Sequence, residues 1–285
     1  MTDPTTTLGT VLITGTSSGI GLATAVACAA AGWTTVATLR DPGRATGLRA
    51  AAERAGVSLD IRVLDVTDES SIARCVHDVV EAHGGLDAVV NNAGAAHVGT
   101  VETDDPAEFR ACVEVNFFGV VALTRVVMPH LRASRGRLVT VSSVGGVIGQ
   151  PFNEAYCAAK FAVEGFLEAL APVAASTGVR VSVVEPGAVA SEFVTSAGMD
   201  PQALLAEAGP YAPALGAYLT RVSTQFAGSA QTASGVADTI TTLMQSPDPA
   251  FRVQTSGGAR AFVATKLTDL DGSAVQTLTT AWVTL

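Results

Sequence analysis

The chain has 285 residues, which is enough for one large α/β domain or two small ones and for a substantial buried core. Hydrophobic residues make up 48% of it and charged residues only 15%, below the roughly 25% of an average soluble protein, which favours a compact fold with much buried sheet. The net charge of -9 argues against nucleic acid and against an anionic membrane surface as partners.

Short β-branched runs alternate with longer helical patterns over the first two thirds of the chain. In chain order, we expect strands at Thr10–Thr14, Thr34–Thr38, Leu59–Leu64, Asp87–Val90, Arg137–Val141 and Arg180–Val184. Between them we expect helices at Ile20–Ala31, Arg44–Ala55, Glu69–His83, Pro106–Leu131, and over a segment that carries Tyr156 and extends toward Ser176. Strands that are apolar throughout and separated by helices indicate a parallel sheet covered on both faces. The sequence therefore predicts a doubly wound α/β fold, with residues 1–285 forming a single domain.

The regular alternation is lost from Gly187 to about Ala230. This stretch is apolar, has few charges, and contains Pro201, Pro210 and Pro213. Such a composition favours a substrate lid at about 187–230 over a disordered linker, which would be more polar. Beyond it the pattern predicts a helix from Val236, a strand at Phe251–Gln254 and a final helix at Ala259–Leu267.

The sequence lacks the patterns typical of targeting, membrane-spanning or metal-binding segments. The stretch MTDPTTTLGTVLITG lacks a basic region followed by an apolar core, and no run of 18 uninterrupted apolar residues occurs, so we expect neither a signal peptide nor a membrane span. The four cysteines form no CxxC pair and the four histidines fit no metal spacing. We therefore expect a cytoplasmic protein without a bound metal, whose cysteines are buried small hydrophobes.

The sequence TGTSSGIG, residues 14–21, follows the first expected strand and opens the first expected helix. Gly15 permits a tight turn, Gly19 lets the backbone approach a pyrophosphate, and Gly21 lets the helix pack on the sheet. Phosphates would meet free N–H groups and the positive end of the helix dipole, and we also assign cofactor contacts here to Ser17, Ser18 and Ile20. A glycine-rich turn without a ligand is the alternative, and the strand–turn–helix context favours a dinucleotide.

The end of the second expected strand, ATLRD, bears on which dinucleotide binds. NAD binders usually place a carboxylate there for the ribose 2′-OH, whereas an arginine accommodates the 2′-phosphate of NADP. Leu39 is apolar and Arg40 follows it, which favours NADP(H) over NAD(H). A small shift of the backbone would instead bring Asp41 to the ribose.

Tyr156 and Lys160 are one helical turn apart and share a helix face. Reduction of a ketone needs a hydride at carbon and a proton at oxygen, and a free tyrosine with a pKa of about 10 is a poor acid at pH 7. An ammonium one turn away would stabilise the phenolate and lower that pKa. A surface pair with a solvated lysine is the alternative, which Ser143 and the dinucleotide turn disfavour.

The chain resembles the short-chain dehydrogenase/reductase family through motifs that occur in order over residues 10–191. They are TGTSSGIG, Asp65-Val66, Asn91-Asn92-Ala93-Gly94, Asn116, Ser143, Tyr156-x-x-x-Lys160 and Pro186-Gly187. Within that family, VATLRD and SVGGVIGQPFNEAYCAAKFAVEGF are most similar to the estradiol 17β-dehydrogenase and retinol dehydrogenase branch. The resemblance implies a Rossmann fold, an NAD(P) cofactor, and assembly as a homodimer or homotetramer.

The resemblance also assigns cofactor contacts at the ends of later strands. The adenine and its ribose would lie against Asp65, Val66, Asn92, Ala93 and Gly94. The nicotinamide and its ribose would lie against Lys160, Tyr156, Pro186, Gly187, Val189 and Ser191, where Ser191 replaces the usual threonine.

Four catalytic positions follow from the same resemblance, which are Asn116, Ser143, Tyr156 and Lys160. Ser143 would hydrogen-bond the substrate oxygen where negative charge develops, and Asn116 would hold a water that relays protons to Lys160. Substrate contacts are assigned to Val144, Gln150, Phe193, Tyr218 and Arg221. Gln150 and Arg221 replace an apolar residue and a histidine of the steroid branch, which would suit a more polar or carboxylate-bearing substrate.

Two functions are compatible with this sequence. The first is an NADP(H)-dependent oxidoreductase that interconverts a ketone or aldehyde and an alcohol on a fairly apolar small molecule, which would be steroid-, retinoid- or keto-ester-like. The second is a dinucleotide-binding regulator that has lost catalysis. Retention of all four catalytic positions disfavours the regulator.

Overall fold

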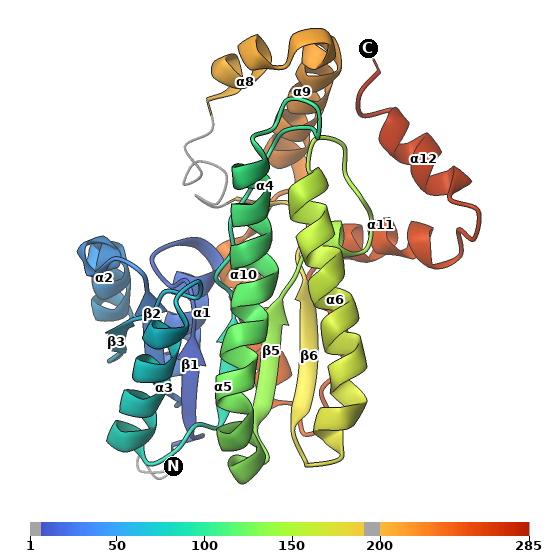
Figure 1. The fold of residues 1–285 in the computed structure, drawn as a ribbon. Coiled ribbons are helices and arrows are strands. Elements are labelled where there is room, and N and C mark those ends of the chain that lie inside the picture. Colours follow the sequence, from blue (N-terminus) through green and yellow to red (C-terminus); the bar gives the residue numbers. More distant parts are fainter. Residues whose placement is uncertain (1–6, 191–199, 285) are drawn as a thin grey trace.

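The structure is a computed structural model that describes residues 7–190 and 200–284. At its centre lies a parallel sheet of seven strands in the order β3-β2-β1-β4-β5-β6-β9 (Figure 1). The strands are β1 (Thr10–Ile13), β2 (Thr34–Leu39), β3 (Asp60–Val63), β4 (Ala88–Asn91), β5 (Arg137–Val141), β6 (Arg180–Glu185) and β9 (Arg252–Gln254). The expected doubly wound α/β fold is confirmed, and each expected strand lies within one residue of its position in the structure.

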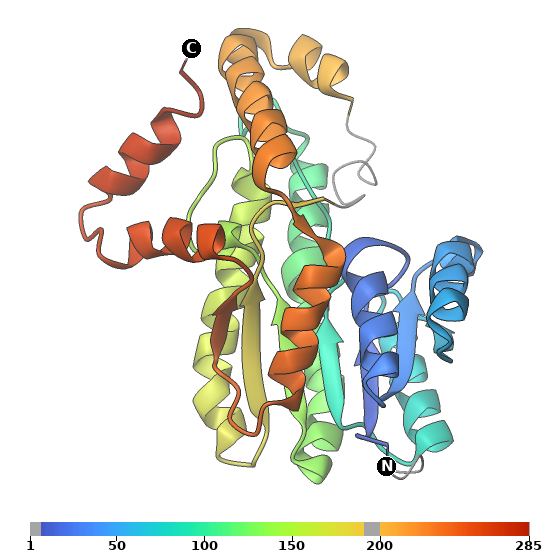
Figure 2. The same ribbon diagram turned by 180° about the vertical axis from the view of Figure 1, so that it is seen from behind.

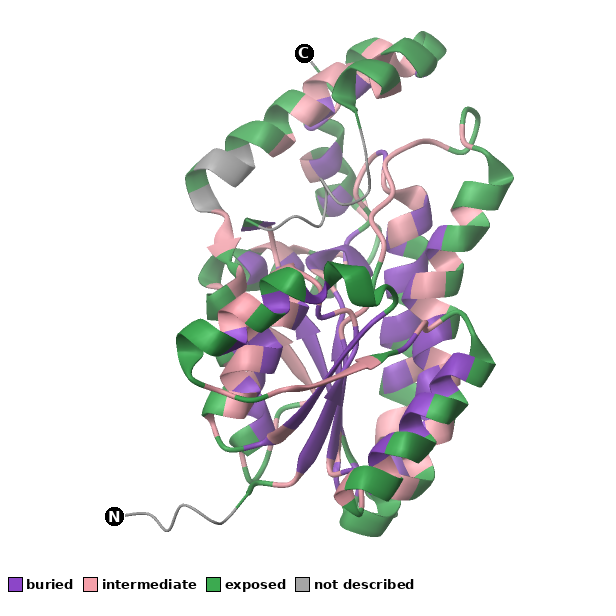
Figure 3. Cartoon of the chain, turned by 90° about the vertical axis from the view of Figure 1, so that its left-hand side faces the viewer, coloured by how far each residue is buried: buried purple, intermediate pink, exposed green. Residues whose placement is uncertain are grey.

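Helices cover both faces of this sheet, as Figures 1 and 2 show from opposite sides. Along β1, Leu12 packs into the apolar cluster of one face, and Val11 and Ile13 pack into the cluster of the other, because successive side chains of a strand point to opposite faces. The first face carries α3 (Glu69–His83), α5 (Gly119–Ser134) and α6 (Glu154–Ala175), and the second carries α1 (Gly19–Ala30) and α10 (Ala233–Gln245). Figure 3 shows the resulting buried sheet between helices whose outer sides are exposed. The four cysteines are buried, as expected.

A continuous helical stretch precedes β5. It consists of α4 (Pro106–Val113), the π-helical turn η2 (Glu114–Phe118) and α5. In the described part of the chain this stretch, 106–134, is the one helix long and apolar enough to cross a membrane by length and composition. Its residues Leu123, Val127 and Leu131 are fully buried against the sheet, which is the packing of a core helix in a folded domain.

The described part of the expected lid region, residues 187–190 and 200–230, contains two α-helices. These are α8 (Pro201–Glu207) and α9 (Ala212–Ser229), joined by η4 (Gly209–Tyr211). The prolines of this region do not interrupt these helices. Pro201 and Pro213 lie in the first turns, where a missing N–H and a fixed φ are favourable.

The C-terminal segment packs beside this lid at the end of the molecule where the strands end (Figure 1). It contains α11 (Gly257–Leu267) and α12 (Ser273–Thr280), of which the second was not expected from the sequence. Phe152, Leu215, Tyr218 and Trp282 form a buried apolar cluster between the lid, the start of α6 and the C-terminal segment. The lid thus has a small core of its own.

A buried ionic network ties α6 to β6 and β9. The guanidinium of Arg252 pairs with Glu164 at 3.0 Å, with Glu185 at 2.7 Å and with the exposed Glu168 at 3.0 Å. The side chains of Glu164 and Glu185 are 6% and 0% exposed, and burial raises the pKa of both carboxyls. One arginine therefore compensates two buried carboxylates at the strand end that leads into Pro186.

This network predicts a pH-dependent loss of stability in Arg252→Met. We expect a loss of about 3 kcal/mol at pH 8, the lower end of values for breaking a buried ion pair, because the Arg252 side chain is 29% exposed. The folded-state pKa values of both carboxyls already lie above the ordinary 4.5, because burial favours the protonated form. These two groups therefore make the folded state less stable as the pH rises from 4.5 through their folded-state pKa values. Removing Arg252 raises those pKa values further, so the loss should be smaller at pH 5, where the carboxyls can protonate.

Urea unfolding at pH 5 and pH 8 measures the difference, with Arg125→Met on the exposed side of α5 as the control. A loss that is the same at both pH values would contradict the role given to the two carboxylates.

Candidate active site

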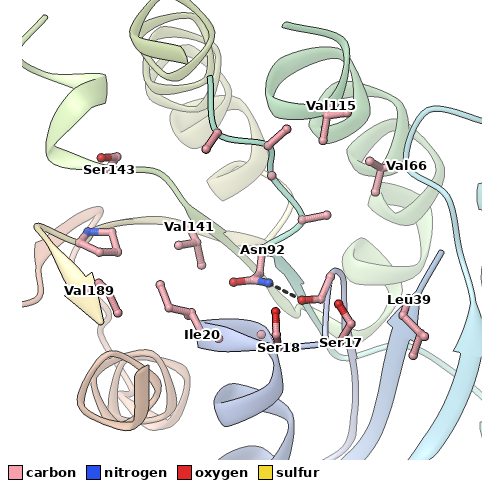
Figure 4. A pocket seen from close by; sticks show the side chains of 18 of the residues that line it. Ser17, Ser18, Ile20, Leu39, Val66, Asn92, Val115, Val141, Ser143 and Val189 are labelled. Carbon is pink, nitrogen blue, oxygen red and sulfur yellow. Dashed lines mark hydrogen bonds between the residues drawn. The ribbon is translucent and has the colours of Figure 1, made fainter. Parts of the chain in front are cut away.

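A cavity of about 750 Å³ opens along the carboxyl ends of the parallel strands. It lies where β1 pairs with β2 on one side and β4 on the other, which is the usual place for a ligand in an open α/β sheet. Figure 4 shows Ser143 and Val189 at one end of the labelled set, and Leu39 and Val66 at the other. The cavity brings together every described residue assigned to the cofactor, which are Gly15, Ser17, Ser18, Gly19, Ile20, Gly21, Arg40, Asp65, Val66, Asn92, Ala93, Gly94, Tyr156, Lys160, Pro186, Gly187 and Val189.

The turn between β1 and α1 presents uncapped N–H groups to this cavity. Gly15 (φ +70°) and Gly19 (φ +57°) adopt the left-handed conformation that glycine tolerates best. The N-cap residue Ser18 makes no side-chain hydrogen bond to α1, whereas Asp68 and Asp105 cap α3 and α4. The first N–H groups of α1 are thus left for a ligand, and the positive end of the helix dipole favours an anion such as a phosphate.

Asn92, at the end of β4, braces the same turn. Its Nδ2 donates hydrogen bonds to the carbonyl oxygens of Thr14 (2.8 Å) and Gly15 (3.0 Å), and Figure 4 shows it reaching toward the turn. The N–H groups of Asn92 and Ala93 both donate to Thr14 Oγ1 at 3.0 Å. Gly21 completes this packing, because a Cβ atom there would collide with Gly15 O and Asn92 Nδ2.

Two arginines lie at the end of the cavity formed by β2. Arg40 follows β2 directly and Arg44 lies in η1 (Pro42–Ala45); both side chains are exposed and both border the cavity. Asp41 also borders it, but Asp41 Oδ1 accepts a hydrogen bond from the Gly43 N–H at 2.9 Å and caps η1. Arg44 was not assigned to the site from the sequence. Its place four residues after Arg40, beyond a Pro-Gly turn, is the signal that could have indicated it.

Ser143, Tyr156 and Lys160 meet at the other end of the cavity. Ser143 follows β5, its Oγ accepts a hydrogen bond from the Gly145 N–H at 3.0 Å, and its hydroxyl hydrogen-bonds the Tyr156 phenol. Lys160 is buried; its Nζ donates to Val141 O at 3.1 Å and lies 5.7 Å from the centre of the Tyr156 ring. A hydroxyl, a phenol and an ammonium therefore stand side by side, as proton transfer to a bound oxygen would require.

Burial controls the pKa values of both ionisable groups. It lowers the pKa of Lys160 to about 8, and Cys112 and Glu164 act in the opposite direction. Burial raises the pKa of Tyr156, while the hydrogen bond with Ser143 lowers it. The expected lowering of the Tyr156 pKa by Lys160 is therefore not found, because desolvation is the larger effect. Tyr156 is held as the neutral phenol, which is the form that donates a proton.

Asn116 lies behind the cavity and does not line it. It is fully buried in η2, where its Nδ2 donates to Ala95 O and Cys112 O, both at 2.9 Å, and its Oδ1 accepts from the Ala95 N–H at 3.3 Å. Its side chain braces the segment that follows β4. The role of holding a water stays a prediction, and these backbone contacts occupy the amide that was assigned to it.

Three of the residues assigned to the substrate pack in or beside the lid and the C-terminal segment, and none of them lines the cavity. Val144 is buried against α11. Tyr218 packs on Phe152 with ring centres 5.7 Å apart, and its hydroxyl oxygen accepts a hydrogen bond from Asn153 Nδ2 at 2.6 Å. The Arg221 guanidinium lies 5.2 Å from the centre of the Trp282 ring. Two further assigned residues, Phe193 of the lid and Ser191 of the nicotinamide site, lie outside the described residues.

Sequence reasoning did not assign several residues that line the cavity. Most are small or apolar, and only some of them end or directly follow a strand, so residue type alone gives no signal for them. They are Leu39, Arg44, Leu64, Ala95, Ala96, Val115, Val141, Ser142 and Ala188, while Asp41, which the sequence offered as the alternative to Arg40, also lines the cavity.

Comparison with known proteins gives consistent matches. A family model described as short chain dehydrogenase matches residues 9–202. Retinol dehydrogenase 8 from Bos taurus is 38% identical over 279 residues, covering 93% of this chain and 86% of its own. The 17-beta-hydroxysteroid dehydrogenase type 1 of Mus musculus is 37% identical over 257 residues, covering 88% and 73%. The structure of a short-chain dehydrogenase from Streptomyces avermitilis superposes with a TM-score of 0.74 at 30% identity, over 97% of each chain.

The packing of the phosphate turn predicts that Gly21→Ala weakens nucleotide binding. The added Cβ would displace Gly15 O or Asn92 Nδ2, and overpacking of this kind costs about 1–3 kcal/mol, so the Kd for NADPH should rise about tenfold or more. Titration of NADPH fluorescence measures it. The control is Gly165→Ala on the exposed side of α6, where a Cβ has nothing within 4 Å. Undiminished NADPH binding by Gly21→Ala would contradict the assignment of this turn.

Proposed function

The chain belongs to the short-chain dehydrogenase family, and on this premise we propose that it is an NADP(H)-dependent oxidoreductase that interconverts a ketone or aldehyde and the corresponding alcohol. The observation that carries the proposal is the continuity of one cavity. One end is formed by the glycine turn and uncapped α1, and the other by Ser143, Tyr156 and Lys160. A ligand long enough to fill it would reach both.

The residues of this cavity fit a nicotinamide dinucleotide. The turn at Gly15–Gly21 would hold the pyrophosphate, Asp65 and Val66 the adenine, and Lys160 with Pro186–Val189 the nicotinamide end. The close packing around Gly21 and the uncapped helix start support the first of these contacts. When bound, the nicotinamide supplies or accepts a hydride.

Tyr156 is the proton donor in the proposed reduction. As hydride reaches the carbonyl carbon, the π electron pair of the C=O bond moves onto oxygen, and that oxygen takes the phenolic proton. The Ser143 hydroxyl hydrogen-bonds the same oxygen and stabilises the negative charge that develops on it. The Lys160 ammonium stabilises the phenolate that remains until it regains a proton from solvent. Oxidation of the alcohol reverses each step.

The preference for NADP(H) is supported by the side chains after β2. Arg40 and Arg44 supply two exposed cations at the cavity, and arginine is well suited to binding a phosphate. Asp41, the carboxylate that would favour NAD(H), is engaged in capping η1. Nearby structures of the fold occur with either cofactor, so this preference rests on the residues of this chain.

A fairly apolar substrate is supported by the apolar composition of the lid. Its residues Leu204, Leu205 and Leu215 pack with Phe152 in a cluster beside the cavity lining rather than in it. The relatives named above carry retinol and a hydroxysteroid in their names. Cytoplasmic location and assembly as a homodimer or homotetramer stay predictions from the sequence.

Arg40→Asp should shift cofactor preference from NADPH toward NADH. Loss of a charged hydrogen bond to the 2′-phosphate, together with the new repulsion, should reduce the NADPH/NADH ratio of kcat/KM by at least about tenfold. Arg44→Asp should act in the same direction. Steady-state rates with each cofactor measure the ratio, with Arg54→Asp at the exposed end of α2 (Thr46–Ala55) as a charge-matched control. An unchanged ratio in both cavity variants would refute the preference.

Tyr156→Phe should remove turnover and leave NADPH binding within about threefold, because it deletes the acid but few other contacts. Single-turnover absorbance at 340 nm and NADPH fluorescence measure the two quantities separately. Retained turnover would remove Tyr156 as the acid. If the wild-type protein binds NADPH but reduces no carbonyl compound, the regulator function gains instead.

A further inference from the structure

The loop between β5 and α6 brings an amide beside the catalytic hydroxyls. A Cβ atom placed on Gly145 would lie 3.4 Å from three atoms, Gln150 Nε2, Ser143 Oγ and Tyr156 Cε1. The Gln150 amide and the Ser143 hydroxyl are therefore no more than twice that distance apart. The sequence assigned Gln150 to the substrate, and the structure places its amide near Ser143 and Tyr156, although Gln150 does not itself line the cavity.

The backbone of Gln150 is fixed, while its side chain makes no hydrogen bond to another described residue. Its N–H donates to Cys157 Sγ at 3.4 Å and its carbonyl accepts from the Asn153 N–H at 3.2 Å, so the residue is held against the start of α6. Within the described residues, its half-buried amide makes no hydrogen bond. An amide carries both a donor and an acceptor group. If a bound substrate covered the Gln150 amide without forming a hydrogen bond to it, burial of these groups would cost binding free energy.

We infer that Gln150 selects substrates that carry a second, neutral oxygen acceptor β to the reacting carbonyl, as in β-keto esters and β-diketones. This inference rests on the proposed function, since it requires a carbonyl bound by Ser143 and Tyr156. The short span between Gln150 Nε2 and Ser143 Oγ favours two oxygens separated by a few bonds over two at opposite ends of a long molecule. The amide would donate to the second oxygen while Ser143 and Tyr156 hold the first.

A neutral acceptor is favoured over a carboxylate by the charges near the site. Arg221, the lid cation that could attract a carboxylate, lies over the Trp282 ring. Lys160 is buried with its Nζ against Val141 O, at the cofactor side of the catalytic pair. The chain as a whole carries a charge of -9, which opposes an anionic substrate.

The test compares two substrates of the same length, ethyl 3-oxobutanoate and 2-heptanone, with NADPH as the reductant. Wild-type kcat/KM should favour the keto ester by about tenfold or more, the scale on which a site that hydrogen-bonds its substrate rejects an analogue without that group. Gln150→Leu, of similar size, should lower this preference about tenfold while changing kcat/KM for 2-heptanone less than about threefold. Gln150→Asn keeps the amide on a shorter stem and should fall between them. Gln245→Leu, exposed at the end of α10, is the control.

The possible outcomes are distinguishable. If Gln150→Leu lowers kcat/KM equally for both substrates, Gln150 positions Ser143 and Tyr156 and does not select the substrate. If Gln150→Leu leaves kcat/KM unchanged for both substrates, Gln150 contacts neither oxygen. Either result overturns the inference and leaves the proposed function intact. A preference for the free 3-oxobutanoate anion over its ester would overturn the neutral class. If wild-type protein with bound NADPH reduces no ketone, the proposed function fails and the inference fails with it. Thermal unfolding and NADPH titration of each variant confirm that the fold and the cofactor site are retained.

Discussion

Four hydrogen bonds between the ends of β4 and β1 hold the arrangement on which the rest of the site depends. Backbone N–H groups of Asn92 and Ala93 share Thr14 Oγ1, and the Asn92 amide donates to the carbonyls of Thr14 and Gly15. Residues 16–91 separate these partners along the chain, yet the parallel pairing of β1 with β4 places both strand ends at one edge of the sheet. The phosphate turn is therefore held from the side, and the start of α1 stays open to the cavity.

The catalytic end of the cavity is positioned by buried charge as much as by apolar packing. Lys160 is desolvated, and the carboxylate one turn further along α6, Glu164, is buried and paired with Arg252 of β9. Arg252 also pairs with Glu185, which directly precedes Pro186, a residue assigned to the nicotinamide. Helix α6, which carries Tyr156, and the end of β6, which is assigned to the cofactor, are thus joined through Arg252. The residues of this link belong neither to the Tyr156–Lys160 pair nor to Pro186–Gly187. Networks of this kind act as a unit, since each member depends on the others for compensation.

The sequence predicted the central sheet well because its strands are short, apolar and separated by helices with clear periodicity. The glycine turn and the Tyr156–Lys160 pair could be located for the same reason, as each depends on local spacing. The two lid helices were not predicted, because this apolar stretch shows no clear alternation of strands and helices; its Pro201 and Pro213 each lie where a helix begins. The pKa of Tyr156 depends on burial by segments distant in sequence, which spacing cannot show. Arg252 pairs with carboxylates that come near it only when the chain folds. Arg44 likewise borders a cavity that forms only on folding.

In the proposed function, one cavity brings a dinucleotide and the Ser143–Tyr156–Lys160 group together for direct hydride transfer. The decisive experiment uses NADPH with deuterium at both C4 positions of the nicotinamide and a prochiral ketone in ordinary water. Mass spectrometry of the isolated alcohol should find one deuterium at the carbinol carbon, since hydride passes from cofactor to substrate without exchange. An unlabelled alcohol, or NADPH that binds without being consumed in the presence of any ketone, would rule out direct hydride transfer in this cavity.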